Sequence, residues 1–333
     1  MNSVSFSFPA HTAPASSLGS LVGSSTAMQE VFRLIERVGP TEANVLLTGE
    51  SGSGKELAAK SIHECSARRE RPFLAINCGA IPAALIEAEL FGYERGVAGA
   101  MRRQAGMFER AQGGTLLLDE VTEMPPDMQT RLLRVLETRK FYRVGASTEL
   151  VCDVRVIAAT SRCPLRAVQS GQLREDLLYR LAAFPVALPP LRSRGEDVEL
   201  LAEHFLTELN AQGGTQKRLS TPARMILRQH NWPGNVRELK NCVAQAYILA
   251  DTVLEPAPLI QGAARSAEAA NDRERLDIRV GSRIHDMERS LIEATLDYFK
   301  GNKRRAADAL GCSLKTLYNK LNGYSQSQEC ANS

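Results

Sequence analysis

Short apolar runs alternate with segments of helical periodicity from Leu21 to about Pro190. The runs lie at 44–48 (NVLLT), 72–76 (PFLAI), 114–120 (GTLLLDE), 154–160 (VRVIAAT) and 184–188 (FPVAL). Between two of them, Met128, Leu132, Val135 and their neighbours form an apolar stripe typical of a core-facing helix. Continuously apolar strands separated by helices are typical of a parallel sheet that is buried on both faces. The pattern therefore predicts an α/β domain over residues 21–190.

The pattern changes after PPLRSRGED (189–197). Apolar residues then recur at helical spacing, which predicts a helical subdomain over 191–254. Residues 255–282 mix Pro, Ala, Gly and charge without a sustained period, as linkers do. Residues 283–324 predict a small all-α domain. We expect a flexible leader at 1–20, because that segment is rich in Ser, Ala and Pro, and a tail at 325–333.

Composition limits the class of protein. The chain has 333 residues, 44% hydrophobic and 24% charged, which excludes fibrous and disordered classes. Seven cysteines contain no CxxC pair, which favours a reducing compartment. No apolar stretch is long enough to cross a membrane and no signal peptide is visible, so we expect a cytoplasmic protein. The net charge of +3 does not by itself indicate a nucleic-acid partner.

The segment GESGSGK directly follows the apolar run 44–48 and opens a predicted helix at 56–66. Glycines let backbone N–H groups surround phosphate oxygens, and the lysine neutralises them, so this order of elements indicates ATP binding. An ordinary glycine-rich turn is the alternative. The predicted ATP-binding residues are Gly49, Glu50, Ser51, Gly52, Ser53, Gly54, Lys55 and Glu56. Because Glu56 replaces the usual Ser or Thr, the magnesium ion needs another carboxylate.

That carboxylate is provided by the run GGTLLLDE, which ends in two adjacent acids, Asp119 and Glu120. Side chains of neighbouring residues in a strand point in different directions. We therefore expect Asp119 to hold Mg²⁺ through water and Glu120 to orient the attacking water. A strand that simply ends in solvent-exposed acids is the alternative.

Residues 301–321 carry a local charge that the bulk composition conceals. Five cations and one acid, Asp308, give this stretch a net charge of +4. Gly311-Cys312-Ser313 separates two short helices, with Ala306, Ala307 and leucines as the shared core, which predicts a helix-turn-helix that contacts DNA phosphates. A basic hairpin that only solubilises the chain is the alternative. The candidate DNA-contacting residues are Lys303, Arg304, Arg305, Ser313, Lys315, Thr316, Asn319 and Lys320.

Residues 21–254 resemble the AAA+ ATPase domain of bacterial enhancer-binding proteins, the activators of sigma-54 RNA polymerase. GESGSGKE, GGTLLLDE, LREDLLYRL and NWPGNVREL all match that family. The resemblance implies that Asn77 couples to Glu120, that Thr160 senses the γ-phosphate and that Arg237 contacts the nucleotide from the lid. It further implies that Arg174 and Arg180 are arginine fingers that reach a neighbouring subunit in a ring, expected to be a hexamer. Surface arginines paired with Glu175 or Asp176 are the alternative.

One motif departs from the family. Its GAFTGA loop, which grips sigma-54, is represented here by Gly96, Val97, Ala98, Gly99 and Ala100, one residue shorter and without Phe or Thr. The chain could therefore use another sigma factor or a partner subunit with a full loop, or Val97 could suffice for a weaker grip. A rival interpretation is a DNA-binding regulator, a repressor or a regulator of the housekeeping polymerase, in which ATP sets only the oligomeric state.

Residues 286–324 resemble the Fis-type DNA-binding domain of the same activators. The resemblance makes Ser313–Leu321 the recognition helix, with Lys315, Thr316 and Asn319 facing base edges and Tyr318 in support. Twenty residues before Leu21 cannot form a receiver domain, so control is expected from expression level or a separate binding protein. The sequence thus predicts an ATP-dependent regulator that binds DNA upstream of promoters and remodels promoter-bound polymerase.

Overall fold

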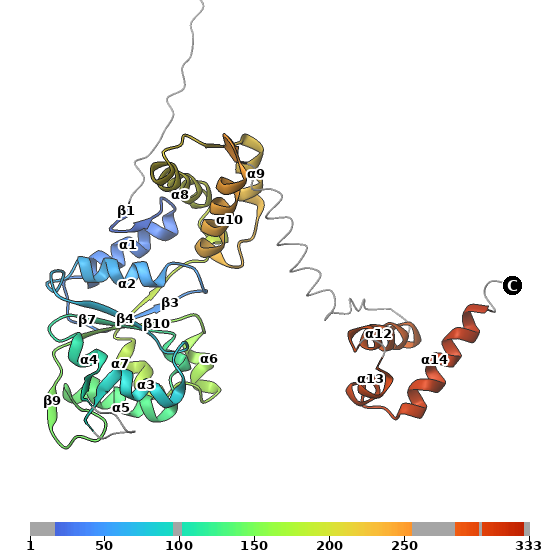
Figure 1. Ribbon diagram of the computed structural model, residues 1–333, viewed down its shortest axis with the longest axis horizontal. Helices are drawn as coiled ribbons and strands as arrows, with labels where there is room; N and C mark the ends of the chain where they lie inside the picture. Colours follow the sequence, from blue (N-terminus) through green and yellow to red (C-terminus); the bar gives the residue numbers. More distant parts are fainter. Residues whose placement is uncertain (1–16, 96–101, 255–283, 300–301, 330–333) are drawn as a thin grey trace, which may run out of the picture. The chain divides into compact units, whose positions relative to one another are not determined.

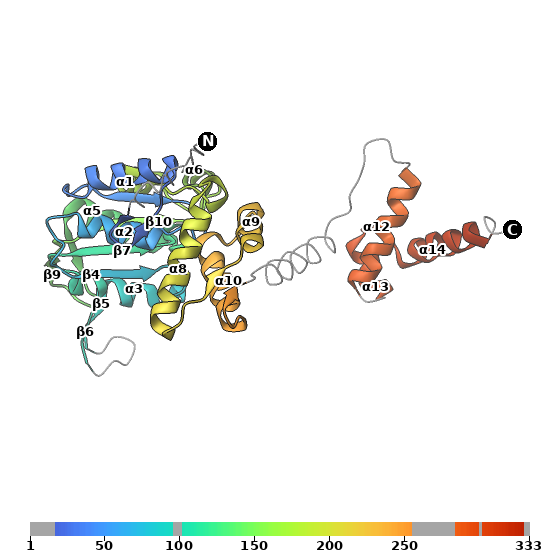
Figure 2. The same ribbon diagram turned by 90° about the horizontal axis from the view of Figure 1, so that it is seen from above.

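The computed structural model describes residues 17–95, 102–254, 284–299 and 302–329. The chain divides into two compact units, Met1–Ala257 and Pro258–Ser333. Figures 1 and 2 show both units, each of which is described by itself below. In the described residues, no helix combines the length and the apolar character that a membrane span requires.

A parallel sheet forms the centre of the first unit (Figure 1). Its five strands are β3 (Val45–Thr48), β4 (Phe73–Asn77), β7 (Thr115–Asp119), β10 (Arg155–Thr160) and β11 (Phe184–Ala187). They lie in the order β11-β3-β10-β7-β4, and every neighbouring pair is parallel. The prediction of a parallel sheet from the apolar runs is confirmed.

Helices cover both faces of the sheet, as Figure 1 shows. One face carries α1 (Thr26–Val38) and α2 (Lys55–Glu64). The other carries α3 (Ala83–Phe91), α4 (Met107–Arg110), α5 (Pro126–Thr138), α6 (Pro164–Gln169) and α7 (Glu175–Leu181). Leu116 and Leu118 of β7 pack in the second layer and Leu117 in the first. Because side chains alternate between faces, a strand buried on both sides must be continuously apolar.

Three short hairpins border this core, and the sequence analysis did not predict them. They pair β1 (Ser17–Leu18) with β2 (Leu21–Val22), β5 (Gly92–Tyr93) with β6 (Gln104–Ala105), and β8 (Lys140–Tyr142) with β9 (Glu149–Val151). The first hairpin corrects the expected leader, because residues 17–20 are part of the fold. Gly19 turns the chain at φ +58°, and the Leu18 carbonyl accepts a hydrogen bond from Ser61 Oγ at 2.9 Å.

Residues 191–254 contain α8 (Asp197–Gly213), α9 (Thr221–Gln229) and α10 (Asn235–Leu249), preceded by the 3₁₀ turn η3 (Leu191–Ser193). A small parallel pair, β12 (Arg218–Leu219) and β13 (Val253–Leu254), adds strands to a segment expected to be helical only. Helices α8 and α10 pack side by side (Figures 1 and 2). Asp197 attaches α8 to α1, because its buried carboxylate accepts hydrogen bonds from the backbone and hydroxyl groups of Ser24 and Ser25 at 2.6–3.1 Å.

In its described residues, the second unit contains α12 (Ile284–Tyr298), α13 (Lys303–Ala309) and α14 (Leu314–Glu329). Its core contains Ala306, Ala307 and Leu317, as the sequence predicted, together with Ile292. Gly311 turns the chain between α13 and α14 at φ +67°. Helix α14 continues to Glu329, so the expected tail at 325–333 begins inside a helix. Gly323 lies within it, and a helical glycine costs only about 1 kcal/mol.

Candidate functional site

The candidate ATP site lies at the carboxyl ends of the central strands. Residues 49–55 connect β3 to α2 and form the phosphate-binding loop, hereafter the P-loop. The strand register aligns Thr48 with Thr160, and Asn77 with Asp119. Because parallel strands end at one edge of the sheet, the P-loop, the two acids and Thr160 are brought together there.

Three glycines give the P-loop its backbone shape. Gly49, Gly52 and Gly54 have φ values of +152°, +77° and +105°. A Cβ atom added to Gly52 would lie 2.4 Å from the Gly234 carbonyl oxygen, so no larger residue fits against the start of α10. Glycine is thus required at Gly52 for both conformation and space.

Side chains from within and outside the P-loop donate hydrogen bonds to its carbonyl groups. Lys55 Nζ donates to Gly49 O at 2.8 Å and to Glu50 O at 3.2 Å. From the segment 191–254, the Asn235 amide donates to Ser51 O at 3.1 Å and Arg194 donates to Ser53 O at 2.5 Å. Since the carbonyl and the N–H of one trans peptide point in opposite directions, these bonds turn the N–H groups toward the other side of the loop. The loop is therefore preorganised for an anion.

Lys55 is buried and lies near both acids, with Nζ 3.9 Å from Glu120 Oε1. Burial lowers the pKa of Lys55, and the charges of Glu120 and Asp119 act in the opposite direction. Burial also raises the pKa of Asp119, and the charge of Glu120 adds to this rise. A site with one buried cation and two acids is suited to a ligand that contains phosphate groups and carries a bound metal ion. Glu56 is exposed in the first turn of α2.

Asp119 and Glu120 point in different directions, as expected for adjacent residues at a strand end. Asp119 Oδ2 accepts a hydrogen bond from Asn77 Nδ2 at 3.1 Å. Glu120 Oε2 accepts hydrogen bonds from both N and Oγ of Ser161, each at 2.9 Å. Glu120 also has φ +50°, a left-handed conformation that costs a non-glycine residue on the order of 1 kcal/mol. Ser161 was not singled out from the sequence, although a hydroxyl follows β10 at that position.

Two residues with roles implied by the family resemblance have other partners in this structure. Asn77, expected to couple to Glu120, instead contacts Asp119, because the β4–β7 register places these two residues opposite each other. Its Oδ1 also accepts from the backbone N–H groups of Gly79 and Ala80. Thr160, expected to sense the γ-phosphate, is fully buried and its hydroxyl lies 3.0 Å from the Thr122 hydroxyl.

The segment from η3 to α10 reaches the P-loop through charged and polar side chains. Arg237 donates to Ser51 Oγ at 3.1 Å, so the predicted lid arginine does lie beside the loop. Glu50 accepts two hydrogen bonds from Arg192 at 2.6 and 2.7 Å and one from Asn235 at 3.1 Å. The Arg192 hydrogen bonds, then that of Asn235, lower the pKa of Glu50 to about 2. Sequence reasoning missed Arg192, Arg194 and Asn235.

Arg174 immediately precedes α7 and Arg180 lies on it, and neither side chain contacts the P-loop, Asp119 or Glu120 in the described residues. Arg174 forms a bidentate ion pair with Asp176, at 3.0 and 2.7 Å, and donates to Thr130 Oγ1 at 3.3 Å. Arg180 donates to the carbonyl of Leu136 at 3.1 Å. Within one subunit, Arg174 thus forms a surface pair with Asp176, the alternative to an arginine finger, whereas Arg180 pairs with neither Glu175 nor Asp176 in the described residues.

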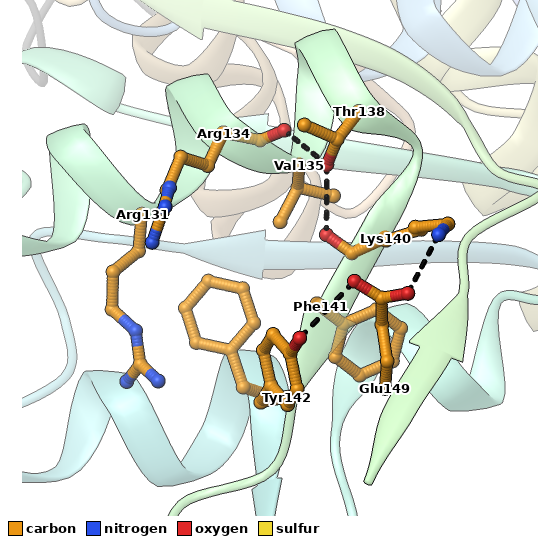
Figure 3. A pocket seen from close by; sticks show the side chains of 9 residues that line it. Arg131, Arg134, Val135, Thr138, Lys140, Phe141, Tyr142 and Glu149 are labelled. Carbon is orange, nitrogen blue, oxygen red and sulfur yellow. Dashed lines mark hydrogen bonds and ion pairs between the residues drawn. The ribbon is translucent and has the colours of Figure 1, made fainter. Parts of the chain in front are cut away.

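No group of three or more His, Cys, Asp or Glu side chains suited to a metal ion occurs in the described residues. The predicted loop residues Gly96, Val97, Ala98, Gly99 and Ala100 lie outside the described residues. A separate cavity of about 460 Å³ lies between α5, β8, β9 and the end of α3 (Figure 3). Its wall includes Arg131, Arg134 and Lys140, and no P-loop residue lines it. This cavity is therefore distinct from the candidate ATP site.

The second unit presents most of the predicted DNA-contacting residues on its surface. Arg304, Arg305, Lys315 and Asn319 are exposed. Ser313 is also exposed and caps the start of α14: its Oγ accepts from Thr316 N at 3.1 Å and lies 2.7 Å from Thr316 Oγ1.

Two predicted cations of this unit have intramolecular partners. Lys303 Nζ lies 4.5 Å from the centre of the Tyr318 ring. Lys320 was expected to face outward, but it forms an ion pair with Glu288 of α12 at 2.5 Å. Helix packing brings Lys320 and Glu288 together although they are 32 positions apart in the sequence.

Comparisons with known proteins agree with this geometry. Residues 21–187 match the sigma-54 interaction domain, residues 192–276 an AAA+ ATPase lid domain and residues 283–324 the Fis family of bacterial regulatory proteins. The chain is 42% identical to the DNA-binding transcriptional regulator NtrC of Azospirillum brasilense, covering 94% of this chain and 71% of that one. It is 43% identical to the transcriptional regulatory protein FlbD of Caulobacter vibrioides, covering 90% and 69%.

A solved structure is also similar. The crystal structure of NtrX from Brucella abortus in complex with ATP has a TM-score of 0.67 and 35% identity, and the match covers 92% of this chain and 69% of that one. The sigma-54 interaction match spans the shortened loop at 96–100, so the rival interpretation, in which ATP sets only the oligomeric state, receives no support. By these matches, the chain belongs to the family of sigma-54-dependent AAA+ transcriptional regulators with a Fis-type helix-turn-helix domain.

Proposed function

We propose that this protein hydrolyses ATP in a ring of subunits, expected to be a hexamer, and uses that energy to remodel sigma-54 RNA polymerase at promoters. The observation that carries the proposal is the convergence of a preorganised P-loop, Lys55 and two differently oriented acids at one edge of the sheet. This set can bind a nucleoside triphosphate and orient a water molecule for attack on its terminal phosphate. Because the target is promoter DNA, we propose that the protein acts in the cytoplasm.

Each residue of the site has a proposed role. The N–H groups of the P-loop and Lys55 bind the phosphates, and Glu120 orients the attacking water and accepts its proton. The buried Asp119 carboxylate has a raised pKa, so a nearby cation would stabilise its charged form. We propose that Asp119 holds Mg²⁺ through water. When bound, Mg²⁺ would neutralise phosphate charge.

Asn77 donates a hydrogen bond to Asp119 and lies on β4, the strand next to β7. We propose that it shifts between Asp119 and Glu120 as the nucleotide changes, and that Thr160 responds to the γ-phosphate through Thr122. Arg237 would follow the nucleotide from the lid, because it already contacts Ser51.

Arg174 and Arg180 are proposed to complete the site of the adjacent subunit. An arginine supplied in this way stabilises charge in the transition state and raises the rate about 10³- to 10⁵-fold in related systems. Arg174 would leave Asp176 and bind the phosphate instead. The ion pair with Asp176 is exposed, with both side chains 47% accessible, so breaking it costs little free energy. Hydrolysis should therefore depend on protein concentration.

The second unit is proposed to bind double-stranded DNA upstream of promoters. The exposed cations Arg304, Arg305 and Lys315 would contact phosphates, and Asn319 with Thr316 would reach base edges. We expect Lys315→Ala to weaken binding of a DNA duplex and to reduce its salt dependence. Lys320→Ala provides the matched control, because Lys320 is paired with Glu288 and should contribute less.

The decisive experiment measures open-complex formation by sigma-54 polymerase at high protein concentration, with ATP and without an upstream binding site. We expect opening by the wild-type protein and none by Glu120→Gln, which should still bind ATP. Such opening would show that the short loop Gly96–Ala100 suffices to engage sigma-54. ATP turnover without opening would contradict the proposed action on this polymerase.

A further inference from the structure

Gln129 is a fully buried polar residue that the proposed mechanism does not use. It lies in the first turns of α5, and its side chain makes hydrogen bonds with three backbone groups. Nε2 donates to Met124 O at 2.8 Å and to Gln172 O at 2.7 Å, and Oε1 accepts from Arg174 N at 2.8 Å. Both amide hydrogens and the amide oxygen are thus engaged. A buried amide so fully used sets the positions of the groups that it connects.

The groups that Gln129 connects belong to the two ends of the proposed catalytic machinery. Met124 ends the short turn that begins at Glu120, which includes η2 (Val121–Glu123). Gln172 and Arg174 form the turn that begins α7, and Arg174 is the residue just before that helix. A single side chain therefore fixes the turn after the catalytic glutamate to the turn that carries the proposed arginine finger.

Arg162 forms a second connection parallel to the first. Its guanidinium pairs with Glu123 Oε1 at 2.6 Å and donates to Gln172 Oε1 at 2.8 Å. Its backbone N–H donates to Thr160 Oγ1 at 3.1 Å, next to Ser161, which binds Glu120. Arg162 thus joins the end of β10 to the same two turns. Arg162 is partly exposed, however, whereas Gln129 has no access to water that could replace a lost partner.

We infer that Gln129 is a positioning residue that couples Glu120 of one subunit to the arginine finger, Arg174, which that subunit offers to its neighbour. A shift of the Glu120–Met124 turn would be passed through one rigid amide to the backbone of Arg174. The nucleotide state of a subunit would thereby determine how effectively its Arg174 supports hydrolysis in the adjacent subunit. This inference rests on the proposed trans role of Arg174.

The first test separates positioning from nucleotide binding. Gln129→Met has a similar length and removes all three hydrogen bonds, whereas Gln129→Glu keeps the acceptor for Arg174 N but places an oxygen near two carbonyls. We expect Gln129→Met to lower kcat at least tenfold and to change the Kd of a fluorescent ADP analogue less than twofold. Size-exclusion chromatography and thermal unfolding establish that each variant folds and assembles. A proportional loss of ADP affinity and kcat would indicate a structural role only and would overturn the inference.

The second test measures how a variant subunit affects ATP turnover in its wild-type neighbour. Glu120→Gln subunits bind ATP without turnover, so in mixed rings they serve mainly as donors of Arg174 to wild-type neighbours. Wild-type protein is mixed with an excess of Glu120→Gln, Glu120→Gln/Gln129→Met or Glu120→Gln/Arg174→Ala subunits, and turnover per wild-type subunit is measured. We expect the two double variants to lower that turnover at least tenfold relative to the single variant.

The outcomes distinguish this inference from the proposed function. If only the Arg174→Ala donor lowers turnover, Arg174 acts in trans and Gln129 does not position it, which overturns the inference alone. If neither donor lowers turnover, the trans role of Arg174 fails and the inference fails with it.

If Gln129→Met subunits do not fold, Gln129→Glu takes their place. We expect this donor to lower turnover less than Arg174→Ala does, because it keeps the acceptor for Arg174 N; a Glu120→Gln/Gln129→Glu donor that behaves like Glu120→Gln alone overturns the inference.

Discussion

The side-chain amide of Asn235, the first residue of α10, donates a hydrogen bond to the Glu50 carboxylate in the P-loop at 3.1 Å. The same amide reaches Ser51 O, and its oxygen accepts from Leu191 N at 2.8 Å. Asn235 is fully buried and has φ +53°, a conformation that asparagine tolerates better than most residues. One side chain therefore attaches the helical segment directly to the loop that would bind phosphate.

Replacement of Asn235 tests both its hydrogen bonds and its backbone conformation. Asn235→Gly removes the amide but tolerates the positive φ, and we expect a loss of about 3 kcal/mol from the three hydrogen bonds above, at about 1 kcal/mol each. Asn235→Ala adds backbone strain and should be less stable by about 1 kcal/mol more. Urea unfolding of the two variants measures this difference. An Ala variant as stable as the Gly variant would contradict the role of the left-handed conformation.

Glu50 makes the attachment of the P-loop dependent on pH. Its pKa is lowered to about 2, so the stability from its charged form is fully present above about pH 4.5 and is lost as pH falls toward 2. We expect the wild-type protein to exceed Glu50→Gln in Tm by a constant amount from pH 7 to 5. That difference should shrink below pH 4.5. Glu137→Gln, at an exposed site on α5, is the matched control, and a difference that grows on acidification would refute this assignment.

Ser161 holds Glu120, the proposed catalytic glutamate, by its hydroxyl and its backbone N–H. Ser161→Ala removes one of the two hydrogen bonds to a charged group, which leaves the Glu120 carboxylate freer to rotate. We expect kcat for ATP hydrolysis to fall about tenfold, equivalent to about 1.4 kcal/mol in the barrier. Ser161→Thr keeps a hydroxyl and should retain most of the activity. Equal losses in both variants would show that the hydroxyl is not what matters.

Cysteine reactivity reports on burial near the site. Burial raises the pKa of Cys78 to about 12 and that of Cys152 and Cys242 to about 11, whereas Cys163 is exposed. Because only the thiolate reacts, we expect iodoacetamide at pH 8 to label Cys163 before these three thiols. Mass spectrometry of the native and guanidinium-unfolded protein measures the order, and all three should react after unfolding. Rapid native labelling of Cys78 would contradict the packing beside Asp119.

The central strands, the P-loop and the start of α14 follow from local patterns in the sequence. The strands could be predicted because a strand buried on both faces must be apolar at every position, as Leu116, Leu117 and Leu118 are. The P-loop could be predicted because positive φ values require glycines at fixed spacing between a strand and a helix. Likewise, the start of α14 at Ser313 follows from local capping chemistry.

The partners of polar side chains that are distant in the sequence were decided only by the tertiary structure. The β4–β7 register places Asn77 beside Asp119 rather than Glu120, and helix packing brings Lys320 within ion-pair distance of Glu288. Glu50 and Asn235 are separated by 185 positions in the chain, and no local pattern relates them. Gln129 looks like an ordinary polar residue of an amphipathic helix until the fold surrounds it. Periodicity and turn chemistry act over a few residues and can be read from the sequence, whereas a buried hydrogen bond depends on which distant backbone the packing brings within 3 Å.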